Sequence, residues 1–121
     1  MALFLQNRAS EVFGVDIHPA ANIAGAVMMD HATGIVIGQT CNIESEVSIF
    51  QGVTLGGTGN ESGKRHPDVK KGATIYASST ILGNIEIGAG STIAAGSLVL
   101  KDVKSGITVA GIPAKELTNP S

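Results

Sequence analysis

Large aliphatic residues recur at every sixth position along most of the chain. They form three runs, which are Ile17, Ile23, Met29 and Ile35; Ile37, Ile43, Ile49 and Leu55; and Val69, Ile75, Ile81, Ile87, Ile93 and Val99. A period of six fits neither an α-helix nor a half-buried strand. It is typical of a parallel β-helix, in which each hexad is a short strand plus a turn, with its aliphatic side chain in the core. Three hexads then make one triangular coil of about 18 residues.

The period is absent at both ends and once in the middle. We expect residues 1–14 to form a short amphipathic helix that caps the first coil, since the end of a β-helix exposes apolar core. Residues 56–68 include five Gly or Pro residues and no large aliphatic residue, which predicts a loop extruded from the β-helix. The period stops at Val99, and residues 101–121 leave it. The β-helix domain is therefore predicted at 15–117, with a tail at 118–121.

The composition excludes some classes of binding partner and indicates where the protein is located. A net charge of −2 with only eight Lys and Arg residues argues against nucleic acid. No apolar run is long enough to span a membrane, and the start of the chain lacks the basic region of a signal peptide. Because Cys41 is the single cysteine and cannot form an internal disulfide, we expect a cytoplasmic protein.

Three histidines are candidates for proton transfer, because imidazole titrates near neutral pH. Asp16 and His31 are 15 residues apart, which places them on neighbouring coils and permits contact. Taken singly, His18, His31 and His66 are equally well explained as surface or turn residues. A larger group of charged and imidazole side chains favours a functional site, and it consists of Asp16, Asp30, His31, Arg65 and His66.

Several short motifs point to one family. They are Phe4-Leu5-Gln6-Asn7, Val15-Asp16-Ile17-His18-Pro19-Ala20-Ala21, Asp30-His31-Ala32-Thr33-Gly34, Val53-Thr54-Leu55-Gly56-Gly57-Thr58-Gly59, Arg65-His66-Pro67, Ile81-Leu82-Gly83-Asn84 and Gly111-Ile112-Pro113-Ala114-Lys115. With them the chain resembles the C-terminal domain of the serine acetyltransferases, which are hexapeptide-repeat acyltransferases, from about residue 2 to residue 117. The resemblance implies a left-handed β-helix that assembles into trimers with active sites between subunits. It also implies acetyl transfer from acetyl-CoA to the hydroxyl of L-serine, in cysteine biosynthesis.

The resemblance also implies roles for single residues. His31 would be the general base and Asp16 its carboxylate partner, while Asp30 would meet the serine ammonium and Arg65 the serine carboxylate. His66 would help to hold substrate and the developing oxyanion. The residues implied along the groove for acetyl-CoA, the co-substrate, are Gly57, Thr58, Ala77, Ala95 and Lys115. No Cys or Ser lies in a nucleophile-plus-base arrangement, which favours direct attack by the acceptor hydroxyl, and no metal is expected.

The sequence departs from the family pattern in several places. It holds no counterpart of the family's large N-terminal helical domain. Gln39 stands where the family has Glu, and Tyr76 and Ala94 replace small residues, usually Gly, so Tyr76 would reshape the groove beside Ala77. The chain ends at Ser121, without the C-terminal isoleucine by which family members dock into cysteine synthase, so this partner is not predicted.

Three alternative interpretations remain open. The acceptor hydroxyl would belong to homoserine or a sugar in the first. In the second the protein is a non-catalytic, truncated homologue. The third is a γ-type carbonic anhydrase, which needs three zinc-binding histidines, but the spacings of 13 and 35 residues between His18, His31 and His66 fit it poorly.

Overall fold

The computed structural model describes residues 2–4, 16–18, 20–29, 34–57 and 66–117, and within them it contains strands and turns but no helix. The strands form three sheets, which we call A, B and C. Sheet A contains β1 (Ala2–Phe4), β4 (Val27–Met29), β7 (Ser48–Ile49), β10 (Thr74–Ile75), β13 (Thr92–Ile93), β15 (Thr108–Gly111) and β16 (Ala114–Glu116). Sheet B contains β2 (Asp16–Ile17), β5 (Val36–Ile37), β8 (Thr54–Gly56), β11 (Thr80–Leu82) and β14 (Leu98–Val99). Sheet C contains β3 (Asn22–Ile23), β6 (Asn42–Ile43), β9 (Asp68–Val69) and β12 (Glu86–Ile87).

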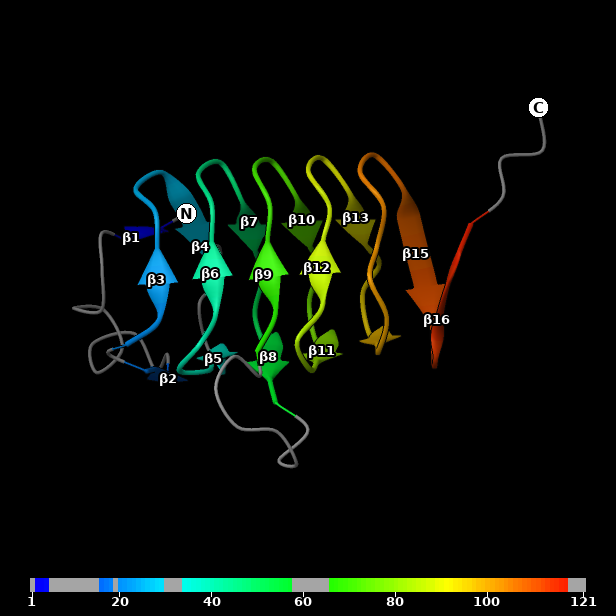
Figure 1. Ribbon diagram of the computed structural model, residues 1–121, viewed down its shortest axis with the longest axis horizontal. Coiled ribbons are helices and arrows are strands. Elements are labelled where there is room, and N and C mark those ends of the chain that lie inside the picture. Colours follow the sequence, from blue (N-terminus) through cyan, green and yellow to red (C-terminus); the bar gives the residue numbers. More distant parts are fainter. Residues whose placement is uncertain (1, 5–15, 19, 30–33, 58–65, 118–121) are drawn as a thin grey trace.

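The chain passes through sheets B, C and A in turn, and each strand pairs in parallel with the equivalent strand of the next coil. In Figure 1 the strands of sheet C point up at the front and those of sheet A point down behind them, while the chain advances from left to right. This sense of rotation makes a left-handed parallel β-helix, as predicted. We name the turns after the sheets that they join, as the AB, BC and CA corners.

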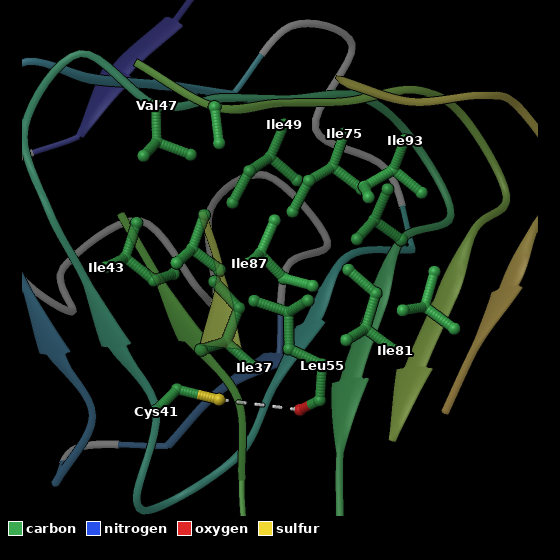
Figure 2. Packing of buried hydrophobic residues seen from close by; sticks show 14 of the residues in the cluster. Ile37, Cys41, Ile43, Val47, Ile49, Leu55, Ile75, Ile81, Ile87 and Ile93 are labelled. Carbon is green, nitrogen blue, oxygen red and sulfur yellow. Dashed lines mark hydrogen bonds between the residues drawn. The ribbon is translucent and has the colours of Figure 1, made fainter. Parts of the chain in front are cut away.

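The aliphatic hexad residues fill the interior of the coils. Those from Met29 to Val99 are at most 2% exposed, whereas Ile23 is half-buried. Figure 2 shows the isoleucines of successive coils stacked in rows along the axis, such as Ile49, Ile75 and Ile93. This stacking follows from the parallel register, because equal positions of neighbouring coils lie directly beside each other.

A second inward position, two residues before each hexad residue, was not predicted. Small or branched residues occupy it and are buried, among them Val27, Cys41, Val47, Val53, Ala73, Ser79, Ser91 and Ser97. The serine hydroxyls satisfy main-chain carbonyls: Ser91 donates to Gly88 over 2.6 Å, and Ser97 donates to Ala94 over 2.7 Å. A hydroxyl is tolerated at this buried position because it is hydrogen-bonded.

The spacing of paired residues locates the insertions. Val36 and Thr54 are paired 18 residues apart, as a regular coil requires. Thr54 and Thr80 are paired 26 residues apart, so eight additional residues are accommodated between β8 and β9. The predicted loop at 56–68 is shorter at both ends, because Gly56 belongs to β8 and Asp68 to β9.

The N-terminal segment differs from the prediction where it is described. Residues 2–4 form strand β1, antiparallel to β4, instead of the start of the expected helix over 1–14. The first strand of sheet A would otherwise present unpaired backbone groups, and an antiparallel segment satisfies them. Residues 5–14 lie outside the described residues, so a helix there stays a prediction.

The row of buried aliphatic residues also continues further than predicted. Val103 bridges to Ile87 and is 5% exposed, and Val109 lies in β15 and is 4% exposed. The continued period was missed because Val103 follows Val99 by four positions, two fewer than the six of a hexad. β16 then pairs antiparallel with β15 and ends the sheet. The part of the chain that the structure describes has no helix that could cross a membrane.

Candidate functional site

His66 is the candidate site residue whose side chain is placed most firmly. It follows the inserted loop, and its ring packs on the turn Gly38–Gln39–Thr40, which joins β5 to β6 at the BC corner. The side chain is buried, with 8% exposed. Pro67, next in the chain, is also buried, and its carbonyl accepts a hydrogen bond from Asn42 N–H over 3.4 Å. The re-entry of the loop is therefore fixed against the preceding coil.

Three hydrogen bonds join His66 to Thr40. The main-chain N–H of Thr40 donates to Nδ1 of the ring over 3.1 Å. The Thr40 hydroxyl lies 2.7 Å from the same Nδ1 and accepts from the His66 main-chain N–H over 2.9 Å. Thr40 thus holds both the ring and the backbone of His66, although the two residues are 26 positions apart.

Gly38 is part of the same contact. A Cβ atom built on it would lie 2.5 Å from Nε2 and 2.8 Å from Cγ of His66, closer than real Cβ atoms approach such neighbours. Only glycine therefore allows the imidazole to lie on this turn. Gly38 and Thr40 were not predicted as site residues, because the local sequence Gly38-Gln39-Thr40 does not indicate that a histidine from a later coil packs on this turn.

The AB corner carries two of the residues implied for the cofactor groove. Ala77 and Ala95 occupy equivalent turns of neighbouring coils, and the carbonyl of Ala77 accepts a hydrogen bond from Gly96 N–H over 2.9 Å. Ala77 is half-buried and Ala95 exposed. The two small side chains leave open a strip of surface along this corner.

An aromatic pair borders this strip. The rings of Phe50 and Tyr76 stack with centroids 5.0 Å apart and an interplanar angle of 16°. Tyr76 is 43% exposed, and in the next coils the equivalent positions are Ala94 and Ala110. The exposed Tyr76 ring therefore lies next to Ala77 in the chain, and the two following coils carry alanine at its position.

The remaining residues of the predicted catalytic group are placed only in part. The backbone of Asp16 pairs with Val36, two residues after Gly34. The structure does not describe the side chain of Asp16. Residues 30–33 and 58–65, which include Asp30, His31, Thr58 and Arg65, also lie outside the described residues. Met29 ends a strand of sheet A and Val36 begins one of sheet B, so the ends of the first segment lie at the AB corner.

Gly57 and Lys115 lie elsewhere. Gly57 directly follows β8 and therefore belongs to the BC corner, with His66. Lys115 is exposed in β16, opposite Ala110, and lines a pocket of about 360 Å³ at the C-terminal end of the β-helix with residues such as Val99, Val109 and Pro113. The described predicted residues therefore lie at three places: the AB corner and the BC corner, at the two ends of the strands of sheet B, and the last coil.

The third histidine has a local partner. His18 is exposed, and its Nδ1 accepts a hydrogen bond from Ala20 N–H over 3.0 Å. This is the surface-turn role that the sequence also allowed for it. Among the described residues no three His, Cys, Asp or Glu side chains lie close enough to hold a metal ion.

Known proteins with similar sequences are serine acetyltransferases. Serine acetyltransferase 4 of Arabidopsis thaliana is 63% identical over 115 residues, which are 95% of this chain and 32% of that protein. The enzyme of Escherichia coli strain K12 is 55% identical over 120 residues, which are 99% of this chain and 44% of that protein. The chain thus spans less than half of the length of these relatives. No protein-family model matches it.

A solved structure is similar in fold. It is serine acetyltransferase from Brucella abortus strain S19 in complex with coenzyme A. The TM-score is 0.88 and the sequence identity is 54%, and the match covers 91% of this chain and 44% of the Brucella chain.

Proposed function

The chain belongs to the serine acetyltransferase family, and on this premise we propose that it transfers the acetyl group of acetyl-CoA to the hydroxyl of L-serine, giving O-acetylserine for cysteine biosynthesis. The observation that carries the proposal is 54% identity, along the coils that hold the candidate residues, to an enzyme solved with coenzyme A. A further enzyme of this family, from Neisseria gonorrhoeae, has been solved with serine. Cys41 is the single cysteine of the sequence and is buried, which supports a cytoplasmic setting.

The reaction needs a base at the acceptor hydroxyl. We assign this role to His31, with Asp16 to orient and stabilise its imidazolium. The deprotonated serine oxygen attacks the thioester carbonyl carbon, the C–S bond breaks, and the proton held by His31 passes to the departing CoA sulfur. The strand register supports the pair. Asp16 pairs with Val36, which is only five positions after His31 in the chain.

Charged groups orient serine for this attack. Asp30 binds its ammonium and Arg65 its carboxylate, for which a planar guanidinium is well suited. Gly57 and Thr58, Ala77 and Ala95 form the CoA groove, and Lys115 lies near the CoA phosphates. Holding both substrates in place supplies much of the rate, since the reaction becomes effectively unimolecular.

The division of these residues between two corners argues for an oligomer. In one chain the AB and BC corners lie at opposite ends of the strands of sheet B. Gly34 and Gly38, at the two ends of β5, are four positions apart, which is about 13 Å of extended chain. An acceptor oxygen cannot touch groups on both edges. We infer a homotrimer in which the AB corner of one subunit faces the BC corner of its neighbour, so that each site uses His31 of one subunit and His66 of the next.

The test is release of free CoA thiol from acetyl-CoA with serine, homoserine and sugars as acceptors. Serine should be the preferred acceptor, and His31→Ala should lower kcat by about 10²–10⁴-fold without changing the mass of the oligomer in solution. His18→Ala is the matched control, because His18 bonds only locally in the described structure, and it should keep wild-type activity. Turnover of a sugar but not of serine would support the other-acceptor alternative, and no release with any acceptor would support the non-catalytic homologue.

A further inference from the structure

Sheet B ends with an open strand edge at the C-terminal end of the β-helix. Among the described strands, β14 pairs only with β11, which belongs to the preceding coil. In the earlier coils the residue just before each inward position donates its main-chain N–H to the next coil, as Thr80 N–H does to the Ser97 carbonyl over 2.8 Å. Leu98 occupies this position in β14, and no described strand of sheet B follows to accept from it.

Leu100 N–H is in the same situation. Its equivalent Gly38 donates to the Leu55 carbonyl of the next coil over 2.9 Å, whereas no acceptor for Leu100 N–H lies in the part of the chain that the structure describes. The open edge therefore presents two main-chain N–H donors two residues apart, from Leu98 and Leu100. An extended chain can add to such an edge as a further strand, because its carbonyls recur at the same spacing.

A pocket of about 360 Å³ lies against this edge. Its lining includes Val99, Val103 and Val109, which are the inward residues of the last coil, and Leu100, which is 48% exposed. In the preceding coil Ile81 is fully buried, since Val99 of the next coil lies beside it. An aliphatic side chain of an added strand would cover Val99 in the same way, and burial of its apolar surface favours binding.

The charges at the pocket indicate which part of a chain would bind. Lys101 follows Leu100 at the BC corner, lines the pocket and forms no ion pair with another described residue. Two carboxylates also line the pocket: Asp102 accepts a hydrogen bond from Glu86 N–H over 2.8 Å, and Glu116 lies in β16. A chain that runs parallel to β14, as each next coil does, reaches the BC corner with its C-terminal end. A terminal carboxylate would then lie beside Lys101.

We propose that the open edge of β14 and the adjoining pocket bind the C-terminal segment of another protein, extended and parallel to β14. Two carbonyls of the segment accept from Leu98 and Leu100 N–H, an aliphatic side chain enters the pocket, and the terminal carboxylate meets Lys101. This interaction is independent of the proposed acetyl transfer, since none of these three residues belongs to the catalytic group. Lys115 lines the same pocket and is assigned to the CoA phosphates, so the test includes displacement by coenzyme A.

Hydrogen exchange of the intact protein tests the edge. In the protein alone, the amides of Leu98 and Leu100 should exchange at nearly the rate of an unstructured chain, whereas the Thr80 amide, bonded to Ser97, should be protected. Protection of the Leu98 and Leu100 amides in the protein alone would show that another part of the chain already covers the edge, and this would overturn the proposal.

Peptide binding tests the pocket. The probe is acetyl-Ser-Ser-Thr-Ile-Leu-Gly with a free carboxylate, which copies residues 78–83 and so has the sequence of a strand of sheet B. Titration calorimetry should detect its binding, and the bound peptide should protect the Leu98 and Leu100 amides. The same peptide with serine in place of isoleucine should bind about tenfold more weakly, because less apolar surface is buried. Absence of binding, or binding without protection of these amides, would overturn the proposal.

A double-substitution comparison tests the carboxylate contact. Amidation of the peptide and Lys101→Gln should each weaken binding about two- to fivefold, as for an exposed ion pair, and the two together should weaken it no further. Lys104→Gln is the matched control, because Lys104 is exposed and does not line the pocket, and it should leave binding unchanged. Additive effects of the two changes would overturn the assignment of the carboxylate to Lys101. Displacement of the peptide by coenzyme A would assign the pocket to the co-substrate and overturn the proposal, whether or not the protein transfers acetyl groups.

Discussion

At the scale of single residues, each AB and CA corner of this β-helix has one residue with left-handed backbone. Most of these positions are glycine, but Ala26, Glu46 and Ser78 adopt φ values of 62–64°. A side chain with a Cβ is strained there, whereas glycine is not. Ala26 and Gly90 make a matched pair, since both lie at the CA corner, and a Cβ at Gly90 would have no atom within 4 Å.

We predict opposite effects of exchanging alanine and glycine at these two turns. Ala26→Gly should raise the free energy of unfolding by about 0.5–1 kcal/mol, because relief of backbone strain outweighs the added entropy of the unfolded chain. Gly90→Ala should lower it by a similar amount. Denaturant unfolding at equal protein concentration measures both changes. A loss of stability in Ala26→Gly would show that the left-handed turn is not the cause of strain.

At the scale of elements, the AB corner combines a packed core face with an open outer face. Ile75 points inward and is fully buried, while the following residue, Tyr76, points outward and stacks on Phe50. The same short segment therefore stabilises the coil and shapes the surface beside Ala77. A change at Tyr76 should affect the groove more than the core.

We predict that Tyr76→Ala raises KM for acetyl-CoA several-fold and leaves kcat nearly unchanged, because the proposed CoA groove loses the ring beside Ala77 while the proposed catalytic groups remain. Stability should fall by about 0.5–1.5 kcal/mol with the aromatic stack. Tyr76→Phe keeps the ring and is the control. If KM stays constant while stability falls, the stack has a structural role only.

At the scale of the whole molecule, the proposed site uses residues from two corners of the β-helix that a single chain keeps apart. Sheet B separates the AB corner, which carries Ala77 and Ala95, from the BC corner, which carries His66. A cyclic trimer joins unlike surfaces of neighbouring subunits, so the proposed homotrimer would bring these two corners together at each interface.

This arrangement predicts complementation between inactive variants. His31→Ala and His66→Ala should each have low activity alone, but trimers reassembled from an equal mixture should recover about a quarter of the wild-type activity, since about one interface in four pairs two intact corners. The thiol-release assay measures the recovery, with each variant carried alone through the same reassembly as the control. No recovery in verified mixed trimers would place both histidines in a site within one subunit.

Much of the fold was predictable because it is locally encoded. The six-residue period places Ile49, Ile75 and Ile93 in one row of the core, and the run of Gly and Pro residues after Leu55 locates the insertion. The continuation of the buried period at Val103 and Val109 was missed because the spacing of the repeat changes just before it. The strand at 2–4 was missed because its pairing depends on an exposed edge of β4, which its own residues do not reveal.

The sequence by itself determined the β-helix, because each hexad carries its own inward side chain and turn, and stacking equal coils satisfies the backbone of all of them. It also singled out His66 as a candidate by its residue type. Only the tertiary structure decided that Gly38 and Thr40 hold the His66 ring, and that Ala77 lies at a different edge of sheet B. These contacts join residues of different coils, and which residues meet depends on the number of residues inserted between the coils.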